Sequence, residues 1–276
     1  MRLSKFVDVY ALSRDLAPAT VENYRVAAQM YDRFSGGVLD DETVNRWIAY
    51  LADGQRSKHT IASRRRALLV LWRAAWEDGL APQPGRIRRV KVPSTAKDVW
   101  TPEQIARLAN QASKLCGWYQ FGGSIVRRAP WWRSLVLSAW DTGLRWSDLQ
   151  RIEFPVRGSF AIVQAKTGNE KTVHLRDSTL SAIRATTDDV PARSLVWPHW
   201  EKRDRFYRWF RSLVVSAELD GTFSKIRRSS ITYVERETPG LGQIHAGHTS
   251  RATTEKWYLN RDVAYGGRRI LPPEAK

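Results

Sequence analysis

Cysteine is almost absent from this chain of 276 residues. Cys116 is the only one, which excludes an intrachain disulfide and a zinc site built on cysteines. No apolar run is long enough to span a membrane, and no secretion or lipidation signal is recognisable. These absences predict an intracellular, cytoplasmic protein that does not act in a membrane.

The fingerprints of nucleotide-using enzymes are missing as well. The sequence contains no Walker loop and no glycine-rich dinucleotide motif. His245 and His248 form an H-x-x-H pair, but no third ligand accompanies them, so no metal site is predicted. Internal repeats and low-complexity stretches are absent too. We therefore expect a globular protein that needs no cofactor.

Negative charge is scarce relative to positive charge. Lysine and arginine total 45 against 28 aspartate and glutamate, giving a net charge of +17. Up to Lys97 the counts are 17 and 10, and after it 28 and 18, so the two parts carry +7 and +10. Contact of both parts with a polyanion explains this balance, whereas a basic surface kept for solubility or an anionic membrane are the alternatives.

The first third of the chain has the periodicity of four helices. Apolar residues recur at helical spacing over 3–10, 21–34, 44–51 and 61–76. Asp40 or Asp41 is a candidate cap for the third helix, and Ser57 for the fourth. Residues 1–81 are therefore predicted to form a helical domain.

Residues 82–97 form a basic, proline-rich segment that we interpret as a linker without a core. Three consecutive arginines on the fourth predicted helix and three more in the linker are candidate phosphate contacts, although a charge run is as often a solvated face. The candidates are Arg64, Arg65, Arg66, Arg86, Arg88 and Arg89.

A second domain is predicted over residues 98–276. Thr101 and Pro102 form a helix start, and helices are expected over 131–140, 146–152, 178–184 and 202–219, followed by a helix around Arg227. Residues 160–165 and 171–175, separated by Thr167-Gly168-Asn169, predict a β-hairpin. The fold class is therefore mainly α with a small β-hairpin or sheet (α+β).

Five residues in this second part could together bind and attack a phosphodiester. A guanidinium offers a rigid donor fork for two phosphate oxygens, a lysine can protonate a leaving oxygen, and a phenol needs nearby cations to act as a nucleophile. Each of them alone is more often a surface charge, a core histidine or an apolar helix edge. In chain order the five are Arg145, Lys166, Arg227, His248 and Tyr258.

Their order and motifs resemble the tyrosine recombinase (phage integrase) family. Thr142-Gly143-Leu144-Arg145 is similar to the first arginine box, Lys166 lies on the hairpin where the family has a lysine, and Gly247-His248 precedes Tyr258 by the family's spacing. The resemblance extends over nearly the whole chain. One position departs from it, because Ser224 stands where the family usually has a histidine, and the neighbouring Lys225 is a partial substitute at best.

The resemblance implies a core-binding-like helical domain and a catalytic domain that close around duplex DNA. It implies attack by Tyr258, a 3′-phosphotyrosyl intermediate and strand exchange through a Holliday junction, with Arg145, Lys166, Arg227 and His248 as the other catalytic residues. It also implies a homotetramer on two double-stranded DNA sites and no metal or cofactor. Accessory DNA-bending proteins are compatible with it. Two alternatives stay open: a DNA-binding protein on this fold that does not cleave, and a related cleaving-rejoining enzyme such as a type IB topoisomerase or a resolvase.

Overall fold

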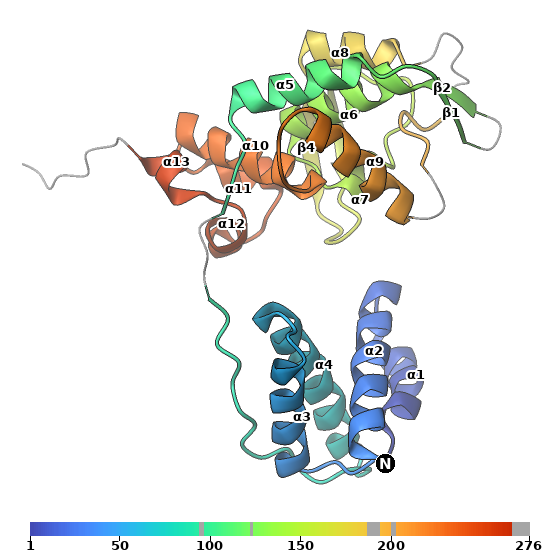
Figure 1. Cartoon of the computed structure of the whole chain (residues 1–276), viewed down its shortest axis with the longest axis vertical. Coiled ribbons are helices and arrows are strands. Elements are labelled where there is room, and N and C mark those ends of the chain that lie inside the picture. Colours follow the sequence, from blue (N-terminus) through green and yellow to red (C-terminus); the bar gives the residue numbers. More distant parts are fainter. Residues whose placement is uncertain (94–96, 122–123, 187–193, 200–202, 267–276) are drawn as a thin grey trace, which may run out of the picture. The chain divides into compact units, whose positions relative to one another are not determined.

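The chain divides into two units, residues 1–95 and 96–276, each with its own core. Both are seen in the computed structural model, which describes residues 1–93, 97–121, 124–186, 194–199 and 203–266 (Figure 1). Helices dominate the described residues, and the strands form two small antiparallel sheets, which confirms the predicted fold class.

Four helices make up the first unit, as the periodicity predicts. They are α1 (Leu3–Arg14), α2 (Pro18–Ser35), α3 (Asp41–Asp53) and α4 (Lys58–Glu77). The Asp40 side chain accepts a hydrogen bond from the Thr43 amide, and Ser57 does the same for Thr60, so both predicted helix starts are capped by a side chain.

The segment after α4 is not free of the core. Ile87 is 7% exposed and belongs to the apolar cluster of the first unit. Arg65 on α4 donates to the carbonyls of Ile87 and Arg88, and the Gly85 amide donates to Asp41 on α3. The expectation of a linker without a core is therefore wrong around Ile87. This apolar residue packs into the core of the first unit, and backbone groups of the segment form hydrogen bonds with side chains of α3 and α4.

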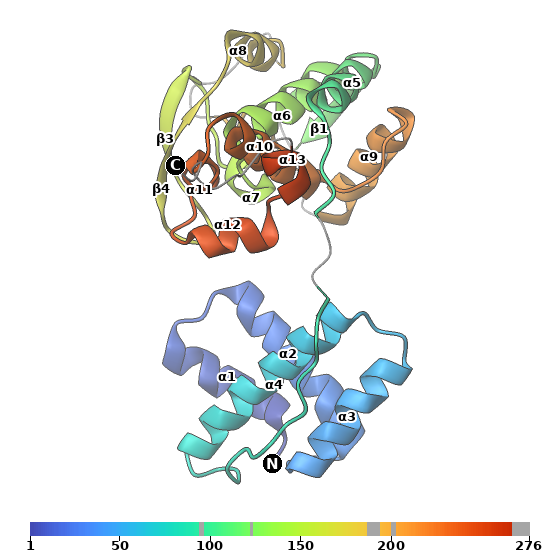
Figure 2. The ribbon, with the colours of Figure 1, turned by 90° about the vertical axis from the view of Figure 1, so that its left-hand side faces the viewer.

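In the second unit the helices surround α6, which contacts α5, α8 and α10 (Figure 2). Its core is rich in aromatic rings, and Trp131, Trp132 and Trp197 are fully buried there. The helices are α5 (Pro102–Ser113), α6 (Arg128–Thr142), α7 (Trp146–Leu149), α8 (Asp177–Arg184), α9 (Arg203–Ser216), α10 (Phe223–Glu237), α11 (Leu241–Ala246), α12 (Arg251–Trp257) and α13 (Arg261–Tyr265).

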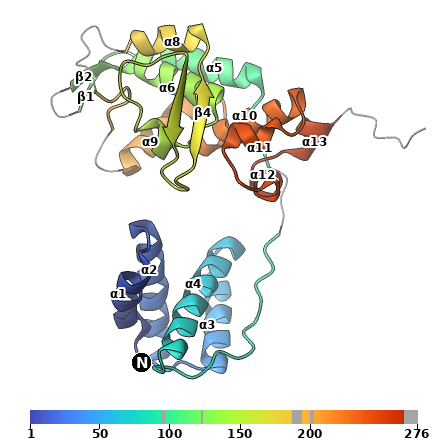
Figure 3. The ribbon, with the colours of Figure 1, turned by 180° about the vertical axis from the view of Figure 1, so that it is seen from behind.

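Two hairpins complete the second unit (Figure 3). The predicted one consists of β3 (Ser159–Val163) and β4 (Glu170–His174), with Ser159 opposite His174 and Val163 opposite Glu170. The sequence did not predict the other, β1 (Trp118–Phe121) with β2 (Ser124–Arg127), nor the short helix α11. Both are short elements whose few residues give too little periodicity to recognise.

Candidate active site

Arg145 follows the C-terminus of α6, where the chain turns through Gly143. The glycine has φ +59°, and a Cβ atom at this position would lie 2.7 Å from Nε2 of His245, so both the backbone and the space require glycine. The Arg145 amide donates to Asp148 over 3.3 Å, and its guanidinium lies 3.9 Å from the same carboxylate. Asp148 is fully buried and also accepts from the Ala165 amide. This carboxylate therefore joins the loop that contains Arg145 to the β3–β4 hairpin.

Arg227 projects from α10 and is almost completely buried. Its guanidinium donates to the carbonyls of Gly143 and Ala246 and lies 3.0 Å from Nε2 of His248. Burial, followed by the charge of Arg145, lowers the pKa of Arg227 to about 10. The arginine therefore stays protonated at neutral pH and links two loops through their backbone.

His248 is held as a neutral ring. Arg227 can only donate, so Nε2 of His248 is the acceptor, and the proton belongs on Nδ1, 2.8 Å from the Thr254 hydroxyl. Burial, Arg227 and other nearby cations lower its pKa to about 4. At neutral pH His248 adds no charge, but it orients Arg227.

Tyr258 follows α12 directly and lies against both of these side chains. The centroid of its ring is 4.6 Å from that of His248, and the guanidinium carbon of Arg227 lies 5.0 Å from the ring centroid. Burial raises the pKa of Tyr258, but Arg227 and Arg145 outweigh it, so the pKa falls below its usual value. The surroundings therefore favour the phenolate, which is the nucleophilic form.

An open pocket of about 570 Å³ brings the predicted residues together. Arg145, Lys166, His248 and Tyr258 all line it, and Arg227 contacts His248 and Tyr258 at its inner side. The five residues come from the α6–α7 loop, the β3–β4 turn, α10 and the segments before and after α12. The fold thus converges side chains that are more than 110 positions apart in the sequence.

The same pocket contains Ser224, with its hydroxyl 2.9 Å from that of Thr222. Arg228, one helical turn later on α10, and Lys97 add two cations to the lining. Lys225 does not replace the absent histidine, because its buried amine pairs with Asp98 and Asp220 outside the pocket.

Two other tyrosines of the C-terminal part, Tyr233 and Tyr265, lie elsewhere. Tyr233 packs against Trp140, with ring centroids 5.8 Å apart. The Tyr265 hydroxyl donates to Glu235, and burial and that carboxylate raise the pKa of Tyr265. Neither ring lines the pocket that contains Tyr258.

In the first unit, two of the six arginines proposed for DNA contact have partners inside the protein. Arg64 donates to the carbonyl and side-chain oxygens of Asn23 on α2, and Arg65 holds the segment after α4. Arg65, Arg86, Arg88 and Arg89 line one pocket of about 780 Å³. Contact of the six with DNA remains a prediction.

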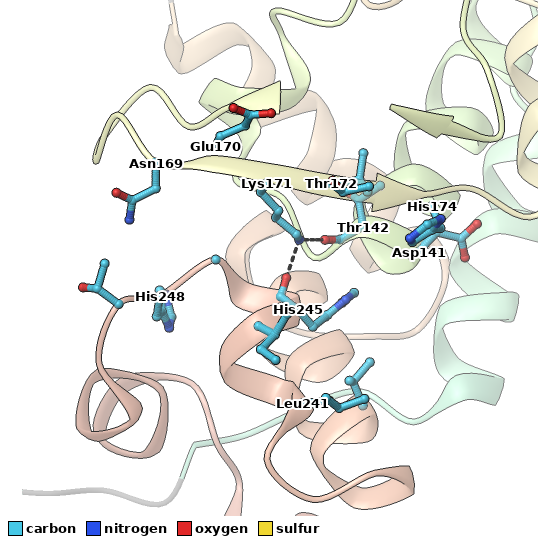
Figure 4. A pocket seen from close by; sticks show the side chains of 15 residues that line it. Asp141, Thr142, Asn169, Glu170, Lys171, Thr172, His174, Leu241, His245 and His248 are labelled. Atoms are coloured by element: carbon cyan, nitrogen blue, oxygen red, sulfur yellow. Dashed lines mark hydrogen bonds between the residues drawn. The ribbon is translucent and has the colours of Figure 1, made fainter. Parts of the chain in front are cut away.

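Sequence reasoning missed Lys171, a buried lysine on β4. Its amine donates to the carbonyls of Thr142 and His245, which lie at the C-terminal ends of α6 and α11 (Figure 4). Burial, followed by the charge of Arg227, lowers the pKa of Lys171 to about 7. The alternation of β4 could have revealed it, because Lys171 shares the buried face with Val173.

Lys171 borders a cavity of about 950 Å³. Figure 4 shows side chains that line it, from β4 and α11 among other elements. The cavity shares Asn169, Gly247, His248 and Thr249 with the pocket of Tyr258 and lies directly beside it. Within the described ranges, no three His, Cys, Asp or Glu side chains gather as a metal site would require, and no helix is long and apolar enough to cross a bilayer.

No protein-family model matches this sequence, and no curated protein matches it either. Solved structures do match. A lambda integrase (75–356) dimer bound to a COC′ core site is 17% identical, with a TM-score of 0.73 and coverage of 99% of this chain and 98% of that chain. A lambda integrase tetramer bound to a Holliday junction is also 17% identical (TM-score 0.72, coverage 99% and 79%). XerH site-specific recombinase bound to difH, in a post-cleavage complex, is 14% identical (TM-score 0.65, coverage 95% and 80%). These likenesses establish that the chain has the fold of lambda integrase and XerH recombinase.

Proposed function

We propose that this chain is a site-specific DNA recombinase that cleaves and rejoins DNA strands with Tyr258 as the nucleophile. One observation carries the proposal: Tyr258 lies in one pocket with Arg145, Lys166 and His248, and Arg227 contacts its ring. The shared fold with lambda integrase and XerH supports it, because both were solved bound to DNA.

The proposed chemistry is a transesterification. The Tyr258 oxygen, having lost its proton to solvent, attacks the scissile phosphorus, and the bond from phosphorus to the 5′ oxygen breaks. Lys166 gives a proton to that oxygen, so the products are a 3′-phosphotyrosyl ester and a free 5′ hydroxyl. Arg145 and Arg227 compensate the charge of the pentacovalent phosphate. Attack by the 5′ hydroxyl of a second strand reverses the step and rejoins the DNA.

The proposed substrate is duplex DNA, and the proposed assembly is a homotetramer on two sites that passes through a Holliday junction. The net charge of +17 suits a polyanion. The tetrameric lambda integrase bound to a Holliday junction, which has this fold, supports the assembly.

The test is covalent capture. Duplexes that bind the purified chain would be selected from a random pool, rebuilt with a nick next to each phosphate of the site in turn, and incubated with protein before a denaturing gel. We expect a protein–DNA adduct with the wild type and none with Tyr258→Phe. Tyr233→Phe and Tyr265→Phe are matched controls that should still form it, because neither ring lines the pocket.

Each other result contradicts a specific part of the proposal. An adduct that survives in Tyr258→Phe assigns the nucleophile to another residue. Binding without an adduct on any nicked site makes the chain a DNA-binding protein that does not cleave. Relaxation of supercoiled plasmid without recombinant products identifies a topoisomerase instead.

A further inference from the structure

Gln164 is a buried polar residue at the end of β3 that contacts three parts of the site without lining the pocket. Its side chain is 1% exposed, so each of its polar atoms needs a partner inside the protein. The amide oxygen accepts from Nη1 of Arg145 over 3.5 Å and from the Thr167 hydroxyl over 3.1 Å. The amide nitrogen donates to the Ala246 carbonyl over 3.1 Å.

Each of these contacts leads to a different predicted catalytic residue. Arg145 is contacted directly, and Thr167 is next to Lys166 in the hairpin turn. The backbone of Gln164 holds the same turn, because its carbonyl accepts from the Gly168 amide over 2.9 Å. Gln164 therefore fixes the turn from both its side chain and its backbone.

The third contact leads to His248. Ala246 ends α11, and its carbonyl accepts from both Gln164 and Arg227. Gly247 follows with φ +64°, and a Cβ atom there would lie 2.7 Å from the Gln164 amide nitrogen. The glycine before His248 thus leaves the space that the amide occupies, which shows close packing between β3 and this loop.

We propose that Gln164 is a positioning residue that sets the distances between Arg145, Lys166 and the His248 loop for the cleavage step. The inference rests on the proposed function and adds a residue that never touches DNA in it. A glutamine suits the role because one planar amide both accepts and donates, whereas a carboxylate or an apolar side chain of the same length cannot do both.

The test compares three variants of the full chain. Gln164→Met keeps the length and loses every side-chain bond, and Gln164→Glu keeps the acceptor but loses the donor and adds a negative charge. Ser134→Ala is the control for stability alone, because it removes the buried hydroxyl that accepts from Trp197 in the core of the same unit. Single-turnover cleavage at saturating DNA and the Kd for DNA would be measured for each across pH.

Displacements of a fraction of an ångström in a catalytic constellation cost large factors in rate. For Gln164→Met we expect the cleavage rate to fall on the order of 10- to 100-fold, with the Kd within about two-fold of the wild type. For Gln164→Glu we expect the pH profile to move to higher pH, since a charge next to Arg145 offsets the cations that favour phenolate at Tyr258. Ser134→Ala should leave the rate and the profile unchanged.

Two results of the cleavage assay overturn the inference: wild-type cleavage by folded Gln164→Met, or an equal loss in Ser134→Ala. Hydrogen exchange monitored by mass spectrometry gives a readout that needs no cleavage. Gln164→Met should speed exchange at residues 164–168 and 245–249, while Ser134→Ala should not. If the wild type forms no adduct, the proposed function fails while this measurement still decides the role of Gln164, and unchanged exchange in Gln164→Met rejects it.

Discussion

Replacing Lys171 by methionine should change how the stability of the protein depends on pH. The amine is buried beside Arg227 and Arg145, with Asp148 as the opposing charge, and its pKa falls from the usual 10.5 to about 7. Two carbonyls at helix C-termini accept from the protonated amine, so the cation is still bonded where it is charged.

Counting the protons bound by each state gives the direction in which the free energy of unfolding changes with pH. Between pH 7 and 10.5 the unfolded chain binds a proton that the folded chain does not, so the free energy of unfolding rises with pH in this window. One pKa unit corresponds to about 1.36 kcal/mol, which gives about 5 kcal/mol for the whole shift and roughly 3 kcal/mol between pH 7 and 9. Below pH 7 the amine is charged in both states, and the cost of burying it is fully present.

The assay is urea unfolding followed by tryptophan fluorescence, at pH 6 to 9, for wild type and Lys171→Met. The free energy of unfolding of wild type relative to the variant should increase by roughly 3 kcal/mol over this range. Thr172→Val, at the next position on β4, removes no titratable group. The difference in the free energy of unfolding between wild type and this variant should therefore be constant across pH. A constant difference for Lys171→Met as well would show that the two carbonyls keep the amine protonated throughout, and the reasoning from burial would be wrong.

Three further predictions concern the same unit. Gly247→Ala puts a side chain into a left-handed conformation, at a cost of about 1–2 kcal/mol, and displaces the Gln164 amide, so both Tm and cleavage rate should fall; an unchanged rate would contradict the close packing. The imidazole of His248 should show no NMR titration from pH 8 to 5, because its pKa in the folded chain is about 4. Its usual pKa is 6.5, so its contribution to stability is lost as the pH falls from 6.5 to about 4. An NMR titration midpoint near 6.5 would refute this. Lys225→Met should lower Tm without changing the cleavage rate of folded protein, since the pairs with Asp98 and Asp220 lie outside the pocket, and a slower rate would restore Lys225 as a catalytic candidate.

Local patterns in the sequence were sufficient for the helices of the first unit. Apolar spacing predicts α1 to α4, and the caps Asp40 and Ser57 predict where two of them begin, because capping and periodicity depend on residues within a turn or two of each other. The hairpin of β3 and β4 was predictable for the same reason, from a short turn between two alternating runs.

The predicted site residues were found through the order of their motifs. That order indicates that the residues belong to one site, but not which contacts they make. Only the folded chain shows that Arg227 is buried and bonded to the carbonyls of Gly143 and Ala246, or that His248 accepts from it. It also shows that Arg228 lines the pocket while Lys225 turns away from it to pair with Asp98, a difference that no local pattern in the sequence indicates.

Composition and motif order thus determined by themselves that the chain is a basic, mainly helical protein with a candidate phosphodiester site. Tertiary structure decided which residues support that site. Gln164 and Lys171 donate hydrogen bonds to carbonyls at the ends of α6 and α11, and those partners are 29 to 82 positions away in the sequence. Backbone carbonyls carry no side-chain identity, so contacts to them leave no mark in the sequence of the partner, and only the three-dimensional path of the chain brings them to an amide or an amine.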